Sequence, residues 1–269
     1  MAPYAVRQPS IHELGSDLLL VSPWKLLIGL ARPFLCFGAY WLFAYVGWWP
    51  AAILAVAGLQ FFTYTSASHD LAHRTLRLPR GFNESMLALC EGLALRSGHA
   101  FRITHLHHHR CLAEDTDVEA KGATGSLWRA LLCGPGYQVR LFRWAWARAH
   151  RNERHWMALE ASAALAFAVA AIVLMRSSPE LLIYTLLVIT SAWLYPVATV
   201  WWPHHGTDNS TLSGTRAFRG NLVPALLFQH TYHLEHHLYP MVPAHQWAEL
   251  GKRLDPYLKK SGVTPVQLP

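Results

Sequence analysis

Apolar residues gather in four long stretches of the chain, at about residues 24–46, 51–67, 156–175 and 181–202. A helix needs about 20 mostly apolar residues to cross the hydrocarbon core of a bilayer, and each stretch is close to that length. The link between the first two stretches (47–50) and the link between the last two (176–180) are short. The pattern therefore predicts an all-α membrane protein with four transmembrane helices in two hairpins.

The remaining residues, 68–155 and 203–269, are more polar and are expected to form a helical cap on one side of the membrane, all within a single domain, 1–269. Tryptophans and arginines alternate at near-helical spacing between Tyr137 and Trp156. This pattern predicts an amphipathic helix that lies in the membrane interface. Pro243 predicts the start of a short helix near the end of the sequence.

Positively charged residues are distributed unevenly around the four stretches. Of the 23 lysines and arginines, 13 lie in residues 68–155 and 6 follow residue 202, whereas the two short links together contain only Arg176. Because lysine and arginine are enriched in cytoplasmic loops, both termini and the cap are predicted to be cytoplasmic. We expect an integral protein of the inner or plasma membrane. The net charge is +7, and the lysines and arginines lie next to the apolar stretches. This distribution favours contact with a lipid bilayer and argues against nucleic acid as a partner.

Histidine is unusually frequent, with 17 residues in the chain, and eight of these form three clusters. The cluster HDLAH contains His69 and His73, at i, i+4. The clusters HLHHH and HLEHH each have histidines at i, i+3 and i+4, and these are His105, His108 and His109 in the first and His233, His236 and His237 in the second. Residues three and four apart share one helix face. Each cluster therefore aims its imidazoles toward one point.

Three such faces could converge and supply eight nitrogen ligands. Histidines at the ends of membrane spans are individually more often interfacial or structural, but that alternative does not explain two copies of H-x-x-H-H with one H-x-x-x-H. A single zinc ion takes about four ligands, so the number of imidazoles predicts two metal ions. Nitrogen ligation suits zinc, copper, iron or nickel, and spacing does not choose among them.

Several further residues are candidates around this site. His204 is the preferred ninth ligand, with the adjacent His205 as the alternative, whereas His107 points away from the ligand face of its cluster. Metal-bound imidazoles usually donate their other N–H to a carboxylate or carbonyl. Asp70 and Glu235 are the first candidates for that role, followed by Asp208 and the acidic run Glu114–Asp117. Cys111 is expected to be a buried thiol and not a ligand.

The three histidine boxes together resemble those of the membrane fatty-acid desaturase and hydroxylase superfamily. Within it, three stretches are most similar to beta-carotene hydroxylases of the cyanobacterial type: FRITHLHHHRCLAEDTD, PHHGTDN with TRAFRGNLVPALLFQ, and TYHLEHHLYPMVP. This resemblance assigns the extra ligand to His204. It departs at His230, where the family pattern leads us to expect an amide side chain. His230 is therefore a candidate for a contact around the metal ligands or for a substitute ligand.

The resemblance implies a four-helix membrane stalk whose cytoplasmic cap holds two non-haem irons. It also implies attack with O₂ on an unactivated C–H bond of a lipophilic substrate, with no catalytic residue beyond the metal ligands. A carotenoid ring is the favoured substrate, and the alternative is an acyl lipid or fatty acid that is desaturated. Electrons are expected from a separate protein such as ferredoxin or a cytochrome with its reductase, because the sequence has no C-x-x-C pair and no G-x-G-x-x-G fingerprint. A histidine-rich metal transporter is the distant alternative.

Overall fold

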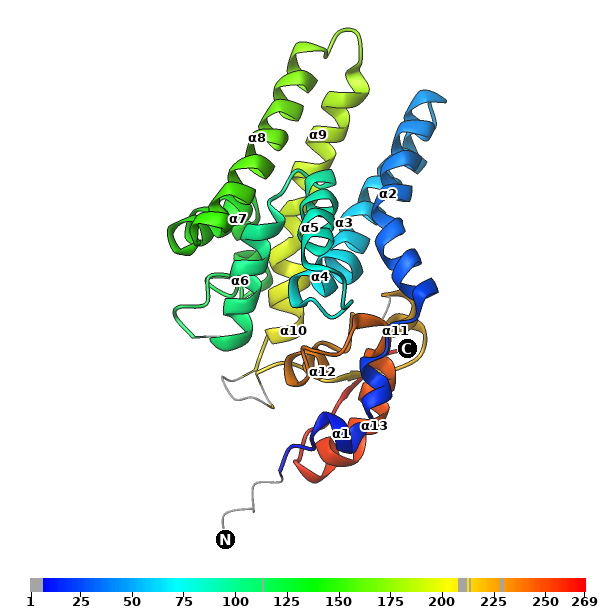
Figure 1. Cartoon of the computed structure of the whole chain (residues 1–269), viewed down its shortest axis with the longest axis vertical. Helices are drawn as coiled ribbons and strands as arrows, with labels where there is room; N and C mark the ends of the chain where they lie inside the picture. The colour runs from blue at the N-terminus through cyan, green and yellow to red at the C-terminus, as the bar shows by residue number, and fades with distance from the viewer. Residues whose placement is uncertain (1–6, 113, 208–211, 213, 228–229) are drawn as a thin grey trace.

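The computed structural model describes residues 7–112, 114–207, 212, 214–227 and 230–269. Helices dominate this part of the chain, and its one strand pairing joins β1 (Phe218–Arg219) to β2 (Val266–Gln267) in parallel. Four helical runs, 23–45, 49–73, 151–173 and 179–204, are long and apolar enough to cross a membrane. The structure confirms the predicted helical class and the four candidate spans (Figure 1).

The first two spans are α2 (Pro23–Tyr45) and α3 (Trp49–Phe62), which pack against each other. Tyr40 and Ala44 on α2 are buried with Ala52 and Val56 on α3. The turn between the helices passes through Gly47, whose φ of 75° lies in the left-handed region that favours glycine. The turn therefore brings the two apolar helices back alongside each other.

The second and fourth spans extend further than the apolar pattern predicts. Beyond the predicted end at residue 67, α3 continues through a π-helical turn (Thr63–Ser68) into α4 (His69–His73). Similarly, α9 (Pro179–Ser191) continues through a 3₁₀ turn and a π-helical turn (Pro196–Trp201) into α10 (Trp202–His204). Both histidine-bearing ends are therefore entered through a π-helical turn, a feature that is frequent at functional sites.

The surfaces of α2 and of the third span, α8 (Arg151–Val173), are strongly apolar. Leu35 and Leu42 on α2 and Leu165 and Val173 on α8 are among the many large apolar side chains that are exposed. Proteins in water rarely expose continuous apolar patches of this kind. These surfaces are therefore suited to contact with lipid.

The other helices gather near one end of the four spans. In chain order they are α1 (Ile11–Leu14), α5 (Arg80–Leu93), α6 (Gly98–Arg110), α7 (Leu127–Arg148), α11 (Leu222–Leu226), α12 (His233–Leu238) and α13 (Trp247–Lys260). Figure 1 shows α1, α12 and α13 at the end opposite to the loop that joins α8 to α9. Leu234 on α12 packs with Trp247, Leu250 and Leu254 on α13 in a buried core. This core gives the short α12 a fixed position.

The prediction of one continuous amphipathic helix from Tyr137 to Trp156 is wrong. This segment is divided between α7, which ends at Arg148, and α8, which begins at Arg151. His150 adopts an extended backbone as the N-cap of α8, and its N–H donates to the Glu153 carboxylate at 2.8 Å. This local cap starts a new helix within a pattern that is otherwise continuous. The short helix that the sequence predicts after Pro243 is present as α13, which follows a 3₁₀ turn.

Candidate metal centre

Nine histidines on four helices converge at the end of the bundle where α12 lies. Their ring nitrogens form two groups, and within each group the atoms lie within 4.8 Å of one another. The first group comprises His69, His73, His105, His109 and His236, and the second comprises His108, His204, His233 and His237. The structure therefore brings together all nine histidines that the sequence analysis selects.

The first group is tightly clustered around His236. The Nε2 atom of His236 lies 2.9 Å from Nε2 of His69 and 2.7 Å from Nε2 of His109. Nε2 of His109 is in turn 3.3 Å from Nε2 of His105. Metal–imidazole bonds of about 2.1 Å place neighbouring ligand nitrogens roughly 3.0–3.4 Å apart in octahedral or tetrahedral geometry. The observed separations are close to this range, so these rings fit donors around one ion.

The second group has the same character. Nε2 of His233 lies 3.2 Å from Nε2 of His204 and 3.1 Å from Nε2 of His237. The His108 ring centroid lies 5.1 Å from the ring centroids of both His204 and His237. A neutral imidazole has one N–H and one ring nitrogen that accepts. Rings packed with Nε2 facing Nε2 therefore match the chemistry of a shared cation better than that of a hydrogen-bond network.

Each H-x-x-H-H box contributes to both groups. On α6, His105 and His109 belong to the first group and His108 to the second, and on α12 the pair His233 and His237 belongs to the second group and His236 to the first. Residues four apart lie on nearly one side of a helix, whereas adjacent residues are turned by about 100°. The extra histidine of each box therefore reaches the neighbouring group. The two groups meet where the rings of His109 and His237 stack at 4.2 Å.

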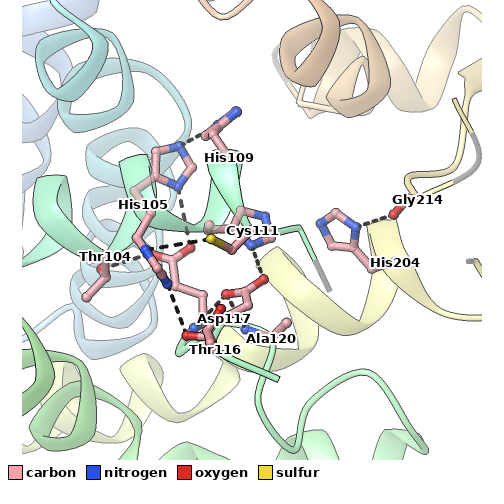
Figure 2. A network of polar contacts seen from close by, with 12 residues as sticks. Thr104, His105, His109, Cys111, Thr116, Asp117, Ala120, His204 and Gly214 are labelled. Atoms are coloured by element: carbon pink, nitrogen blue, oxygen red, sulfur yellow. Dashed lines mark hydrogen bonds and ion pairs between the residues drawn. The ribbon is translucent and has the colours of Figure 1, made fainter. Parts of the chain in front are cut away.

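Three of the histidines are oriented through hydrogen bonds from Nδ1. His108 Nδ1 lies 2.7 Å from an Asp117 carboxylate oxygen, and His204 Nδ1 lies 2.7 Å from the Gly214 carbonyl. His105 Nδ1 makes a longer contact of 3.4 Å with Glu119. Figure 2 shows Asp117 beside the second histidine box and the contact between His204 and Gly214. With the proton held on Nδ1, the lone pair of Nε2 is left to face the group.

The charge of Asp117 also changes the acidity of His108. Burial lowers the pKa of His108, but the hydrogen bond and the negative charge of Asp117 raise it by more, so its pKa lies above the ordinary value. Asp117 belongs to the acidic run that the sequence analysis ranks second, and Glu119 lies just beyond that run. The sequence gives no signal for Glu119, because its contact depends on the fold of the loop after α6.

The two carboxylates ranked first occupy different positions from those expected. Asp70 accepts hydrogen bonds from the Thr75 hydroxyl at 2.9 Å and from the Ala244 amide at 3.0 Å. Glu235 is fully buried and forms an ion pair of 2.7 Å with Arg219. Each carboxylate therefore ties its short helix to a neighbouring segment, and among the described contacts neither is hydrogen-bonded to one of the nine histidines. Asp208, the third candidate, lies outside the described residues.

Three other candidates face away from both groups. His205 Nδ1 lies 3.1 Å from the Gly125 carbonyl, and its ring stacks on Trp201. His107 Nε2 lies 3.1 Å from the Thr116 carbonyl. Cys111 contacts His107 and is part of neither group. Between the neighbours His204 and His205, the structure therefore places His204 in the cluster.

An apolar cavity of about 300 Å³ lies between the second and fourth spans. Its lining includes Phe61, Tyr64, Leu194 and Trp202, and it reaches His230. Polar side chains in the wall are bonded internally, as when the Thr199 hydroxyl donates to the Tyr195 carbonyl at 2.8 Å. Ala57 and Leu194 are exposed on the apolar surface of the spans, so the cavity opens toward the region expected to contain lipid.

His230 stands between this cavity and the second histidine group. Its ring centroid is 5.5 Å from that of Tyr64 and 6.0 Å from that of His233. It belongs to neither group. Burial and the nearby His105 lower the pKa of His230 to about 4, which makes the ring neutral near pH 7. His230 therefore presents an uncharged polar edge at the inner end of an apolar cavity.

A buried network that spacing does not reveal supports α4. The ring of His99 contacts Glu160 at 2.7 Å and Glu84 at 3.0 Å. Glu84 also accepts from Arg102, and Arg102 donates to the Leu71 carbonyl in α4 at 3.1 Å. These partners come from α5, α6 and α8, so no local pattern in the sequence links them. Trp247, which the sequence analysis also does not select, packs its ring against those of His69 and His236.

A family model described as fatty acid desaturase matches residues 43–269. The chain belongs to the fatty acid desaturase family. No curated protein shows significant similarity to it.

Membership confirms the broader resemblance seen in the histidine boxes. It implies an oxidoreductase of the desaturase or hydroxylase type, integral to the membrane, that acts on a lipophilic acyl substrate. The likeness to beta-carotene hydroxylases is finer than this match and stays a prediction.

Proposed function

We propose that this desaturase-family protein uses O₂ and two non-haem irons to hydroxylate or desaturate the hydrocarbon part of a membrane lipid. The observation that carries the proposal is the division of nine histidines into two groups of converging ring nitrogens. The apolar cavity that ends at His230 supports it, because the cavity leads from the lipid-facing surface to the second group.

The five imidazoles of the first group and the four of the second are the proposed ligands. Nitrogen donors suit iron as well as zinc or copper, and membership of the family favours iron. When bound, the irons supply the binding and reduction of O₂. Hydroxylation consumes one O₂, two electrons and two protons and yields an alcohol and one water, whereas desaturation yields an alkene and two waters. The protein holds the ligand rings in place and excludes bulk water.

Asp117→Asn is expected to weaken metal binding at the second group by about tenfold to a hundredfold. One Asp117 oxygen contacts His108 Nδ1, and the other accepts from the backbone N–H groups of Glu119 and Ala120. An asparagine has only one accepting oxygen, so it favours the wrong tautomer of His108, and it removes the negative charge that raises the pKa of His108. Isothermal titration of the metal-free protein with Fe²⁺ under anaerobic conditions measures the change. The control is Asp115→Asn, an exposed neighbour, and equal affinity in both variants would contradict the proposed role of Asp117.

The substrate is proposed to enter sideways from the bilayer between the second and fourth spans. A volume of about 300 Å³ is at the lower end of the range for ligand pockets, so the cavity accommodates one chain or one ring and not a whole lipid. A carotenoid ring is the first candidate because of the sequence likeness. An acyl chain is the second, favoured by the family match.

Topology follows from the charges. We propose that both termini and the histidine groups are on the cytoplasmic side of an inner or plasma membrane, because the arginine-rich segments adjoin the histidine-bearing ends of the spans. The electrons are proposed to come from a separate carrier protein.

The test is expression in a carotenoid-producing host, with pigments and fatty acids analysed side by side. Hydroxylated pigment would support the carotenoid candidate, and new double bonds in acyl chains would support the acyl candidate. Absence of both, together with Zn²⁺ uptake by liposomes that contain the purified protein, would favour a metal transporter instead.

Ala57→Trp should lower product formation in that host by about tenfold or more, because the indole fills the rim of the cavity. Its control is Leu54→Trp, which places the same side chain on the exposed face of the same helix, away from the cavity. Both variants should retain the iron content of the wild type. Equal product from the two variants would contradict entry at this rim.

A further inference from the structure

A second, polar groove lies outside the cavity and the histidine groups. It has a volume of about 630 Å³ and is bordered by the loop that joins α4 to α5 and by the first turns of α8. Its lining includes Arg74, Arg80, Arg102, His155 and Trp156. We call it the basic groove.

Positive charge dominates the basic groove and its border. Three arginines line the groove, Arg74, Arg80 and Arg102, against two carboxylates, Glu84 and Glu153. Two more arginines adjoin the lining, Arg77 in the loop between α4 and α5 and Arg151 at the start of α8. All of them except Arg102 are exposed. Both carboxylates are already engaged, Glu84 with Arg74 and Arg102 and Glu153 with the cap of α8. The surface is therefore suited to an acidic partner.

The loop at the border holds its arginines in an unfavourable backbone conformation. Arg74 has a φ of 56° and Arg77 a φ of 55°, in the left-handed region where glycine or asparagine is preferred. The two residues share one turn, in which the Arg77 N–H donates to the Arg74 carbonyl at 3.4 Å. Strained residues of this kind cluster at functional sites. The strain is compatible with selection for cationic side chains at this place.

The basic groove adjoins the first histidine group. Arg74 directly follows His73, whose ring centroid lies 4.7 Å from that of His109, and both histidines are partly exposed as residues. The residues around the end of α6 carry no such excess of positive charge, because the exposed Glu114 and Asp115 are balanced by the exposed Arg110 and Lys121. An acidic protein approaching the histidine groups is therefore attracted more strongly to the arginine loop.

We infer that the basic groove is the docking surface for an acidic electron-carrier protein. This inference rests on the proposed function, which consumes two electrons for each O₂. Two one-electron carriers would be oxidised in successive dockings, the two electrons would pass to the metal ions that the histidine groups would hold, and the protons would come from water. Docking at the loop places the carrier next to His73.

Binding is tested with the iron-loaded protein in nanodiscs of phosphatidylcholine, a lipid without net charge. The probes are an acidic plant-type [2Fe–2S] ferredoxin and the soluble haem domain of an acidic cytochrome. The test variant is Arg77→Glu/Arg80→Glu, which leaves the Arg74–Glu84 ion pair in place. The control is Lys252→Glu/Lys259→Glu on α13, which makes the same change of charge at exposed positions outside the groove.

The wild type should bind one of the two carriers, more weakly as salt is raised, and Arg77→Glu/Arg80→Glu should bind it about tenfold or more weakly. The control should stay within about twofold of the wild type. Dithionite, a small reductant, should reduce the iron at equal rates in all three proteins. Wild-type binding of neither carrier, or equal binding by the test and control variants, would overturn the docking site.

Failure of the proposed function gives a different result. In that case the wild type retains no iron, or its iron is not reduced even by dithionite. If the Arg77→Glu/Arg80→Glu variant loses only its binding to vesicles of anionic lipid and keeps its affinity for the carrier, the groove is a lipid contact and the inference is wrong.

Discussion

His236→Ala is expected to abolish turnover and to lower the iron content from about two ions per chain to about one. His236 is fully buried, and its Nε2 atom lies within 3 Å of Nε2 of both His69 and His109. Its loss removes the ring nitrogen that lies between those of His69 and His109, and with it the central donor of the first group. His108→Ala should act in the same way on the second group, where His108 is also buried. Iron analysis of the purified protein, followed by product analysis, measures both effects.

The matched control is His107→Ala, in the same box as His108. Its ring contacts the Thr116 carbonyl and Trp144 and belongs to neither group, so iron and turnover should be close to those of the wild type. Membrane insertion should be unchanged in all three variants, because the substituted residues lie at the ends of the spans or beyond them. Full activity of His236→Ala or His108→Ala would refute the ligand assignment.

Glu84→Ala should destabilise the protein by about 3–5 kcal/mol, because it removes one partner from a buried ionic network. Arg102, whose side chain is 9% exposed, then keeps its charge without the carboxylate that compensates it. Arg102 also donates to the Leu71 carbonyl, so the position of α4, and with it His69 and His73, should become less well defined. A large fall in the thermal unfolding midpoint in detergent, accompanied by weaker iron binding at the first group, is the expected result.

Glu114→Ala is the control for this effect. Glu114 is exposed, its carboxylate forms no described ion pair, and surface changes of this kind usually stay within about 0.5 kcal/mol. Glu84→Gln should lie between the two, since the amide keeps one hydrogen-bond acceptor but not the charge. If Glu84→Ala unfolds at the same temperature as Glu114→Ala, the network does not support α4.

The spans were predictable because lipid imposes a simple rule on the sequence. An apolar stretch of suitable length is itself the signal, and all four stretches coincide with helices in the structure. Helix ends were less predictable. The boundary at Ala149 depends on a capping interaction between His150 and Glu153, and the extensions to His73 and His204 depend on π-helical turns. Neither the cap nor the π-helical turns interrupt the pattern of apolar residues, so that pattern does not reveal them.

In the candidate site, too, one part could be predicted from the sequence and another part could not. Spacing on a helix is a local property, so the three boxes and the shared faces of their histidines could be deduced from the sequence. The partners that orient the rings are not local. Asp70 and Glu235 are adjacent in sequence to histidines yet face other segments, whereas Asp117 reaches His108 across the loop after α6.

The sequence by itself predicted four helices long and apolar enough to span a membrane, and it grouped the eight histidines of the three boxes, with His204 preferred to His205 as a ninth. Only the tertiary structure decided which five histidines form one group and which four form the other, where the cavity reaches His230, and that His99 joins α5, α6 and α8. The physical reason is the range of the forces involved. Helix periodicity and transfer into lipid act on residues near one another in the chain, whereas donor geometry and buried ion pairs depend on contacts between segments that only the folded chain brings together.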